Sequence, residues 1–441
     1  MATAAFTTLG CKVNQYETQR ILESFEESGF EVVPFDQVAD VYVVNTCSVT
    51  SIAESKSRYT VRRANRQNPD AKVVVTGCAA QMAANRSEAI PGAHLVVPNP
   101  EKLDTLRYLL EAFPGLRPPV RSTRPRHPDL HTRTRATLKI QDGCSVLCSY
   151  CSIPYTRPKM VSRPVGEVVA EAEKLVDMGY RELVLTGVLI GAYGPETGSG
   201  GPGFEDLVER LAGLPGLGRL RISSIEMPQV SPRLVELMRA GKVVPHLHIP
   251  LQSGDDGVLA EMNRRYTQAD YLRLIDDLYK KVPDFLPTTD IMVGFPTETA
   301  ERFASTLHVC REARFLKAHV FRFSPRHGTP ADRWGDPIPL EEKNRRSASV
   351  TEIARKTGAE HARRYLGRTV RVLVEGKIDR DGLLGGLTDN YLEVRFAGPT
   401  SVRRTMVWVR VEDERSGVLY GERVGSPSAT GTSLPIAGGR D

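Results

Sequence analysis

Short apolar runs alternate with amphipathic stretches over the first part of the chain. The apolar runs have the length of buried strands, and the stretches between them have the length and periodicity of helices. This alternation predicts a small doubly wound α/β domain with parallel strands over residues 1–115, whose site loops lie at the strand carboxyl ends. The predicted strands are residues 6–9, 41–44, 72–76 and 94–97, and the predicted helices are residues 15–28, 52–67 and 101–111.

A longer alternation of the same kind occupies residues 136–362. Six strands with intervening helices fit a partial or complete parallel (β/α) barrel, in which chemistry sits at the strand carboxyl ends. The predicted strands are residues 137–140, 182–186, 219–223, 247–249, 289–293 and 318–323.

The pattern changes again toward the end of the chain. Residues 369–374, 392–396 and 405–411 alternate or run apolar between glycine-rich turns, which predicts a small all-β barrel over residues 363–425. Residues 116–135 are rich in proline and arginine and are predicted to be a linker, either a solvated tether or a basic segment that lies along phosphates. The polar tail, residues 426–441, is predicted to be disordered.

Composition narrows the class of protein. A chain of 441 residues with 40% hydrophobic and 25% charged residues fits a soluble protein of two or three domains. No apolar run has the length of a membrane span and no secretory signal is evident, so we expect a cytoplasmic protein without a membrane partner. The net charge of +6 suggests a polyanionic partner without establishing one. Seven cysteines, an odd number, favour metal or redox use over a disulfide framework.

Three of these cysteines form a compact CxxxCxxC loop directly after the first predicted barrel strand. Cys144, Cys148 and Cys151 can hold only three corners of a cubane iron-sulfur cluster. The fourth iron would then stay open to a substrate or cofactor.

Cys11, Cys47 and Cys78 each follow a predicted strand of the first domain. Because the carboxyl ends of parallel strands share one edge, the three thiols are expected to converge and to leave a second open metal position. The alternative is that small cysteines fill tight strand-to-helix turns. Cys310 lies in a helical pattern and is expected in the core.

These motifs resemble the methylthiotransferase family of radical S-adenosylmethionine (SAM) enzymes over nearly the whole chain. The resemblance is carried by the segments around Cys11, Cys47 and Cys78, by residues 144–157, and by residues 386–391, which resemble part of a TRAM domain. The segment Gly10-Cys11-Lys12-Val13-Asn14-Gln15 is most similar to the bacterial branch that acts on N6-threonylcarbamoyladenosine of tRNA. Leu189 departs from the family pattern, because relatives often have a polar residue there.

The resemblance implies two 4Fe-4S clusters. Cys144, Cys148 and Cys151 would bind the cluster that chelates SAM and generates a 5′-deoxyadenosyl radical, which removes hydrogen from C2 of the target adenine. Cys11, Cys47 and Cys78 would hold an auxiliary cluster that presents sulfur, methylated by a second SAM. The implied partners are the tRNA anticodon loop and an electron donor such as flavodoxin or ferredoxin.

The resemblance also suggests residues that bind SAM, whereas no residue is assigned as a general acid or base. Tyr150 would pack on the adenine of SAM, and the backbone at Thr186 and Gly187 would meet its amino group. Ordinary packing and a strand-end turn explain these residues nearly as well. Polar side chains at later strand ends would bind ribose or carboxylate groups, or else form hydrogen bonds within the barrel; they are Glu226, Gln252 and Asp290.

Weaker signals point to RNA. Arginines cluster after Cys47 and before the β module, and aromatic residues of that module would stack on bases if exposed, although a charged face is usually only solvated and such aromatics are more often core. Three alternatives stay open: methylthiolation of isopentenyladenosine in tRNA, methylthiolation of a ribosomal protein, and a non-catalytic RNA-binding metalloprotein with closed four-ligand sites. The residues concerned are Arg58, Arg62, Arg63, Arg66, Arg363, Arg364, Arg368, Arg371, Tyr391, Phe396 and Trp408.

Overall fold

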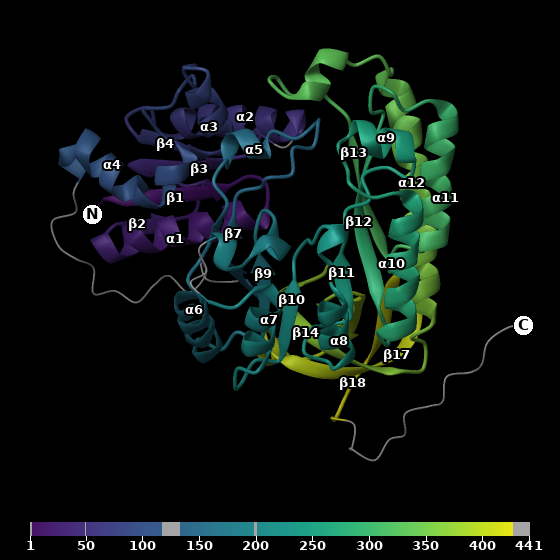
Figure 1. Cartoon of the computed structure of the whole chain (residues 1–441). Coiled ribbons are helices and arrows are strands. Elements are labelled where there is room, and N and C mark those ends of the chain that lie inside the picture. The colour runs from purple at the N-terminus through teal and green to yellow at the C-terminus, as the bar shows by residue number, and fades with distance from the viewer. Residues whose placement is uncertain (1, 49, 117–132, 198–200, 427–441) are drawn as a thin grey trace, which may run out of the picture.

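The computed structural model describes residues 2–48, 50–116, 133–197 and 201–426 (Figure 1). Most of the predicted linker and the predicted tail lie outside the described residues. None of the helices within these ranges is both long and apolar enough to cross a membrane.

The N-terminal unit is a five-stranded parallel sheet in the order β2-β1-β3-β4-β5. Alternate residues of β3 point to opposite faces: Tyr42 and Val44 pack under α2 and α3, whereas Val41 and Val43 pack against α1 and α4. The predicted α/β fold is therefore confirmed, with a short strand β2 and a helix α3 that the sequence pattern did not indicate. The elements are β1 Thr3–Thr8, α1 Lys12–Ser28, β2 Glu31–Val33, β3 Val41–Thr46, α2 Ser51–Gln67, β4 Lys72–Gly77, α3 Cys78–Asn85, β5 Leu95–Val97, η1 Asn99–Asp104, α4 Thr105–Ala112 and η2 Pro114–Leu116.

Six parallel strands form the central unit, as predicted, in two three-stranded sheets, β10-β9-β6 and β11-β12-β13. Val244 donates to the Leu220 carbonyl and Ile225 to the His248 carbonyl, so the strands continue irregularly from β10 to β11 around a partial barrel. The six parallel strands are β6 Ala136–Lys139, β9 Glu182–Thr186, β10 Arg219–Ile222, β11 His246–His248, β12 Leu286–Val293 and β13 Lys317–Arg322. Two short strands, β7 Gln141–Asp142 and β8 Val161–Ser162, form a separate antiparallel pair.

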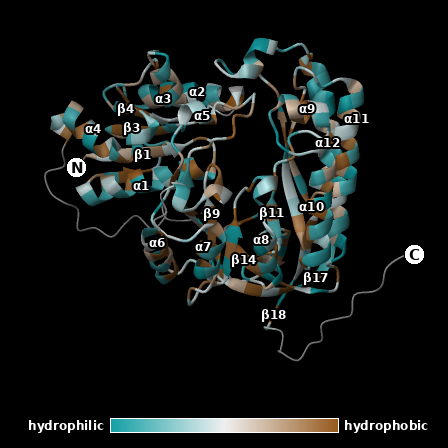
Figure 2. Ribbon diagram, in the orientation of Figure 1, coloured by the Kyte–Doolittle hydropathy of each residue, from teal (hydrophilic) through white to brown (hydrophobic). Residues whose placement is uncertain are grey.

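Helices cover the outside of this partial barrel, and their mixed hydrophilic and hydrophobic colours in Figure 2 are those of helices that bury one face. Cys310 lies in the core beneath them, as expected. The helices are α5 Ile153–Thr156, α6 Val165–Asp177, η3 Ile190–Ala192, η4 Pro195–Thr197, α7 Phe204–Ala212, η5 Met227–Gln229, α8 Pro232–Arg239, α9 Asp256–Glu261, α10 Gln268–Lys281, α11 Ala300–Ala313, η6 Pro330–Trp334 and α12 Leu340–Arg363.

The N-terminal unit packs against both ends of the partial barrel. Helix α1 contacts β6, the first strand. Glu54 of α2 pairs with Arg326, which follows the last strand β13, at 3.2 Å. The N-terminal unit therefore spans the open side of the barrel, as the purple and blue elements of Figure 1 show.

The C-terminal unit is a closed barrel with strand order β14-β15-β16-β18-β17, which confirms the predicted all-β barrel. Arg219 of β10 docks it onto the central unit by donating to the carbonyls of Leu387 (2.9 Å) and Arg371 (2.8 Å) and by pairing with Asp389. Phe396 is in the core of this barrel. Its elements are β14 Thr369–Ile378, β15 Leu384–Thr388, β16 Glu393–Ala397, η7 Thr400–Val402, β17 Met406–Arg415 and β18 Val418–Val424.

Candidate active site

The loop that carries Cys144, Cys148 and Cys151 starts at a glycine that no other residue can replace without movement. Gly143 has φ +81°, and an added Cβ would lie 1.9 Å from the Lys159 carbonyl oxygen. Gln141 donates to the Gly143 carbonyl at 2.8 Å, while its Oε1 accepts from the backbone of Leu189 at 2.8 Å. The loop is thus tied to the segment that follows β9.

Each of the three sulfurs of this loop accepts a hydrogen bond from nitrogen. Backbone amides of Val146 and Ile153 lie 3.4 Å from the sulfurs of Cys144 and Cys151, respectively. Arg264 Nη1 lies 3.5 Å from Cys148 Sγ. Donors of this kind stabilise thiolates, which are the form that binds iron.

Burial opposes that form when no metal is bound. It raises the pKa of the Cys144 thiol to about 11 and that of Cys151 to about 12, against the lowering by the two amides. Bound iron would have to displace these protons. Three donor-supported sulfurs in one loop, with the nearby Arg264 cation, fit a cluster that keeps one iron free of protein ligands.

Arg264 is the most informative residue that the sequence pattern did not identify. Its guanidinium is buried and pairs with Glu226 through both Nη atoms, donates from Nε to the Tyr266 hydroxyl at 3.1 Å, and reaches Cys148. The Arg264 guanidinium therefore connects the predicted site residue Glu226 to the cysteine loop. Nothing in the spacing of Arg264 and Arg265 distinguished the buried arginine from its exposed neighbour.

Thr186 and Gly187 lie at the end of β9, next to the same loop. The Thr186 carbonyl accepts from the Ile140 amide at 2.9 Å, and a Cβ on Gly187 would meet Gln141 Oε1 at 3.1 Å. Tyr150 packs against an apolar cluster that includes Phe295. Contact of these residues with SAM remains a prediction.

Asp290 lies on β12, and Gln252 pairs with this strand from the segment after β11. Gln252 adopts φ +65° and its backbone exchanges hydrogen bonds with the β12 strand, donating to the Asp290 carbonyl at 2.9 Å. The Asp290 carboxylate lies 3.2 Å from His248 Nε2 and 3.5 Å from His319 Nδ1. Burial would raise its pKa, but these hydrogen bonds hold the pKa of Asp290 below its usual range. The two histidines lie on β11 and β13, and the sequence analysis did not single them out.

The structure also brings the three cysteines of the N-terminal unit to one edge of its sheet. Cys11 caps α1 after β1, Cys47 follows β3, and Cys78 begins α3 after β4. These three strands are neighbours in the sheet. Cys11 is exposed, whereas Cys47 and Cys78 are buried. Although Cys11 as a residue is exposed, the surrounding protein withdraws its thiol from water and so raises its pKa, and the nearby Cys78 raises it further.

Two glycines permit this convergence. Gly10 has φ +96°, and an added Cβ would lie 2.7 Å from Cys47 Sγ. Gly77 has φ +97°, and its Cβ would lie 2.3 Å from the Thr46 carbonyl oxygen. Asn14 holds the same turn by donating to the carbonyls of Leu9 (3.0 Å) and Thr46 (2.9 Å). Three cysteines at one edge of the sheet, with no fourth cysteine among the described residues of this unit, fit a second cluster with an open iron.

A buried charge network joins the two cysteine sites. Glu17 of α1 accepts from Lys102 (2.7 Å), Lys139 (2.6 Å) and Arg157, which follows the cysteine loop. Arg157 also pairs with Asp142 at 2.7 Å. The positions of the two cysteine sets are therefore coupled through charged side chains that are withdrawn from water.

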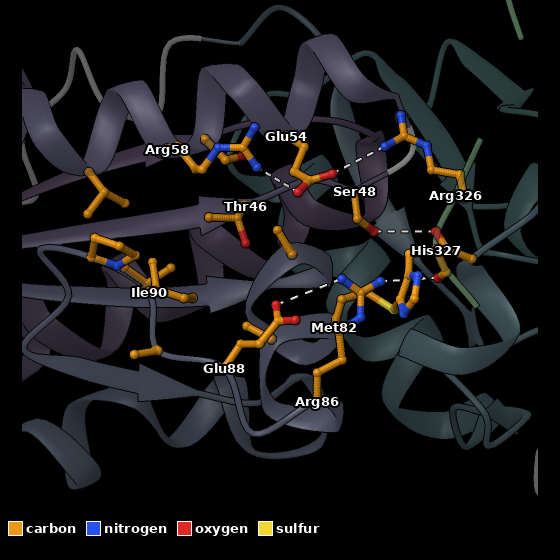
Figure 3. Close-up of a pocket in the computed structure, with 18 of the residues that line it drawn as sticks. Thr46, Ser48, Glu54, Arg58, Met82, Arg86, Glu88, Ile90, Arg326 and His327 are labelled. Carbon is orange, nitrogen blue, oxygen red and sulfur yellow. Dashed lines mark hydrogen bonds and ion pairs between the residues drawn. The ribbon is translucent and has the colours of Figure 1, made fainter. Parts of the chain in front are cut away.

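A separate cavity of about 290 Å³ lies behind Cys47, between α2, α3 and the loop after β13. Figure 3 shows Glu54 between Arg58 and Arg326, with Ser48 and His327 near Arg326 and with Arg86 and Glu88 on the other side of the cavity. Arg326 also acts electrostatically on Cys47. This cavity marks the junction between the N-terminal unit and the barrel.

Two family models match the chain. The one described as uncharacterized protein family UPF0004 matches residues 3–97, and the one described as the radical SAM superfamily matches residues 138–310. A solved radical SAM methyltransferase, TsrM from Kitasatospora setae, shares the fold with a TM-score of 0.55 at 16% identity, over 75% of each chain. The partial barrel and its cysteine loop therefore define a radical SAM enzyme, a class whose members bind a 4Fe-4S cluster and SAM.

Two relatives extend over nearly all of the chain. The threonylcarbamoyladenosine tRNA methylthiotransferase MtaB of Bacillus subtilis is 39% identical over 96% of this chain and 96% of its own length. A tRNA-2-methylthio-N(6)-dimethylallyladenosine synthase of Geobacillus thermodenitrificans is 32% identical over 94% of this chain and 82% of its own. The chain belongs to the methylthiotransferase family of radical SAM enzymes.

Proposed function

We propose that this enzyme methylthiolates C2 of N6-threonylcarbamoyladenosine next to the anticodon of tRNA, using two 4Fe-4S clusters. The observation that carries the proposal is the convergence of two three-cysteine sets, coupled through Arg157 and Glu17, in a chain with 39% identity to a threonylcarbamoyladenosine tRNA methylthiotransferase. A radical SAM enzyme that only cleaves SAM needs one three-cysteine set.

The two cysteine sets have different roles in this proposal. Cys144, Cys148 and Cys151 hold the cluster that binds SAM, while Cys11, Cys47 and Cys78 hold the cluster that binds the sulfur to be transferred. When bound, the first cluster and SAM supply a 5′-deoxyadenosyl radical able to remove hydrogen from an unactivated carbon. The burial of Cys148 and the packing of the partly buried Tyr150 against an apolar cluster support this, because they limit access of water to the radical.

The polar residues at the barrel strand ends orient SAM. Arg264 fixes Glu226, and His248 and His319 fix Asp290, so both carboxylates are held in place before SAM binds. Gln141 fixes the backbone after Thr186 and Gly187 through Leu189. Leu189 is buried and contributes its amide rather than a polar side chain, so its departure from the family pattern leaves this contact intact. Gln252 and Tyr150 complete the predicted SAM-binding set.

The domain roles follow the same division. Residues 1–115 form the methylthiotransferase domain, residues 136–362 the radical SAM domain, and residues 363–425 a TRAM domain that binds the anticodon loop together with the linker. Reduction of the clusters requires an electron donor of the flavodoxin or ferredoxin class. Most of the arginines before the β module form ion pairs within the protein, as Arg368 does with Asp284 at 2.7 Å. We therefore expect other basic residues to contact the RNA.

Iron analysis and nucleoside analysis test the proposal. Anaerobic reconstitution should yield about eight irons per chain, as two cubane clusters require, and a C11A/C47A/C78A variant should retain about half. tRNA from a strain lacking this gene should contain threonylcarbamoyladenosine without its methylthio group. Retention of that group, with no redundant enzyme present, would exclude this substrate, and loss from isopentenyladenosine would favour the alternative family branch.

A further inference from the structure

A basic chamber of about 740 Å³ opens where α1, the start of the radical SAM barrel and the C-terminal barrel meet. Its wall contains six basic side chains and one acidic side chain, Glu375. Such an excess of positive charge around one cavity attracts an anion. The basic residues are Lys12, Arg133, Arg135, Arg221, Arg403 and Arg404.

Some of these cations are already engaged. Arg135 pairs with Glu375 at 2.8 Å, and Arg133 donates to Gln15 at 2.6 Å. Pairs of this kind shape the wall of the chamber, but they leave less charge for a ligand. Arg221 and Lys12 differ from them.

Arg221 is 2% exposed, yet only part of its guanidinium is satisfied. Its Nε donates to Glu182 at 2.7 Å, whereas Nη1 and Nη2 have no hydrogen-bond partner in the described structure. The guanidinium lies 4.9 Å from the centre of the Tyr391 ring. Because buried donors without acceptors are costly, a chamber lined by this group is prepared for an acceptor.

Lys12 provides a second cation on the wall of the chamber, next to Cys11. It is the first residue of α1 and directly follows Cys11. No carboxylate of the described residues lies within ion-pair distance of its ammonium group. The first turn of α1 contains no acidic residue, so the positive end of the helix dipole adds to the charge of Lys12.

The other charged groups around Lys12 do not cancel this charge. Burial, together with Arg135 and Arg221, lowers the pKa of the Lys12 ammonium group, while Tyr391 and Asp290 act in the opposite direction. Asp290 is itself engaged by His248 and His319. The Tyr391 ring stacks on His246 at 4.5 Å, which gives the chamber a flat aromatic wall.

We propose that Lys12, supported by Arg221, binds the carboxylate of the threonylcarbamoyl group and selects this nucleoside over one with an apolar substituent. The inference rests on the proposed function. In adenine, C2 and C6 flank N1 and C6 carries the N6 group, so C2 and the N6 substituent lie on the same edge of the base. A base whose C2 is directed at the Cys11 site therefore presents its N6 substituent on that side of the site, where Lys12 directly follows Cys11. An isopentenyl group would leave the Lys12 ammonium group and the two Nη atoms of Arg221 without an acceptor, which disfavours it.

The test uses two anticodon stem-loops that differ by one charge, one with the natural threonyl carboxylate and one with its neutral amide. Wild-type enzyme should prefer the acid by about tenfold or more in kcat/KM, because a lost charged hydrogen bond costs about 1.4 kcal/mol or more. In K12M the preference should disappear through a loss on the acid alone. Binding affinities, measured by fluorescence anisotropy without SAM, should follow the same pattern. Wild type should bind the acid more tightly than the amide, and K12M should lose affinity for the acid alone.

Controls separate the possible failures. K280M removes an exposed lysine on α10 and should behave as wild type. Iron content must match wild type in K12M, because Cys11 is adjacent. An equal loss on acid and amide, or an unchanged preference, would overturn the role of Lys12 and would assign the chamber to backbone phosphates. A wild-type enzyme that modifies neither stem-loop would instead overturn the proposed function.

Discussion

The guanidinium of Arg157 binds both carboxylate oxygens of Glu17, with Nη1 2.9 Å from Oε1 and Nη2 2.7 Å from Oε2. Arg157 follows the cysteine loop of the barrel, and Glu17 follows Cys11 of the N-terminal unit. Both side chains are almost fully buried. This fork-shaped contact fixes one cysteine set relative to the other.

Removing the charge of Glu17 should therefore destabilise the protein. Glu17→Gln leaves Lys102, Lys139 and Arg157 without their shared carboxylate, and breaking a buried pair of this type costs about 3 kcal/mol. We expect a clearly lower denaturation midpoint in urea. Glu111→Gln removes a carboxylate from an exposed pair on α4 and should leave the midpoint unchanged. Equal midpoints for the two variants would contradict the importance of the network.

The same carboxylate predicts how stability depends on pH. Burial alone would raise the pKa of Glu17, but Lys102, Lys139 and Arg157 hold it well below its usual range. An unfolded glutamate titrates at about 4.3, so the unfolded chain binds more protons below that pH. The contribution of Glu17 is fully present above that pH and is lost as the pH falls below it. Urea midpoints at a series of pH values should fall more steeply for wild type than for Glu17→Gln, and parallel curves would refute this.

Gly10→Ala should selectively disrupt the N-terminal cysteine site. The new methyl group would lie 2.7 Å from Cys47 Sγ, on a backbone at φ +96°. We expect reconstituted iron to fall from about eight to about four per chain if each site holds one cubane cluster. Gly179→Ala is a matched control, because Gly179 has φ +91° but no atom within 4 Å of an added Cβ. Loss of iron in the control would mean that backbone strain alone, rather than contact with Cys47, is responsible.

Arg264→Met should change the electronic properties of the barrel site. The substitution removes the cation that donates to Cys148 and fixes Glu226. Hydrogen bonds to cluster sulfurs and nearby positive charge raise reduction potentials, so the potential of this cluster should become more negative. A redox titration followed by electron paramagnetic resonance measures it. Arg265→Met, at the exposed neighbour, should leave the potential unchanged, and a purely structural role of Arg264 would lower cluster occupancy without shifting the potential.

Arg404→Gln should weaken RNA binding without changing which nucleoside is selected. Arg404 lies on the wall of the chamber and has φ +62°, in the turn before β17. If it contacts a phosphate, affinity should fall equally for the acid and amide stem-loops, and the salt dependence should decrease by about one counterion. Arg355→Gln, on α12, is the control. A loss confined to the acid would move Arg404 into the carboxylate site.

The buried strands and the candidate metal ligands could be predicted well from the sequence, because apolar runs and cysteine spacing are local patterns. Half of the residues in the buried strands β3 and β4 are valine, and both strands are predicted within a residue or two. Strand β15 was missed because its sequence, Leu384–Thr388, contains two glycines and packs only once the barrel closes. Arg264, His248 and His319 were missed because a buried arginine or histidine has no local signature. The contact of Arg157 with Glu17 joins residues far apart in the chain, and only the docking of two units creates it.

The charge network between α1 and the barrel has a consequence for exchanging parts between relatives. Its charged side chains come from both sides of the predicted linker, so each half contributes buried charges whose partners lie on the other half. A chimera that takes residues 1–115 from one relative and the barrel from another must keep Glu17 and Lys102 compatible with Lys139 and Arg157. The two halves are therefore expected to change together during evolution, and an N-terminal half produced alone would expose a charged surface that evolved to be covered.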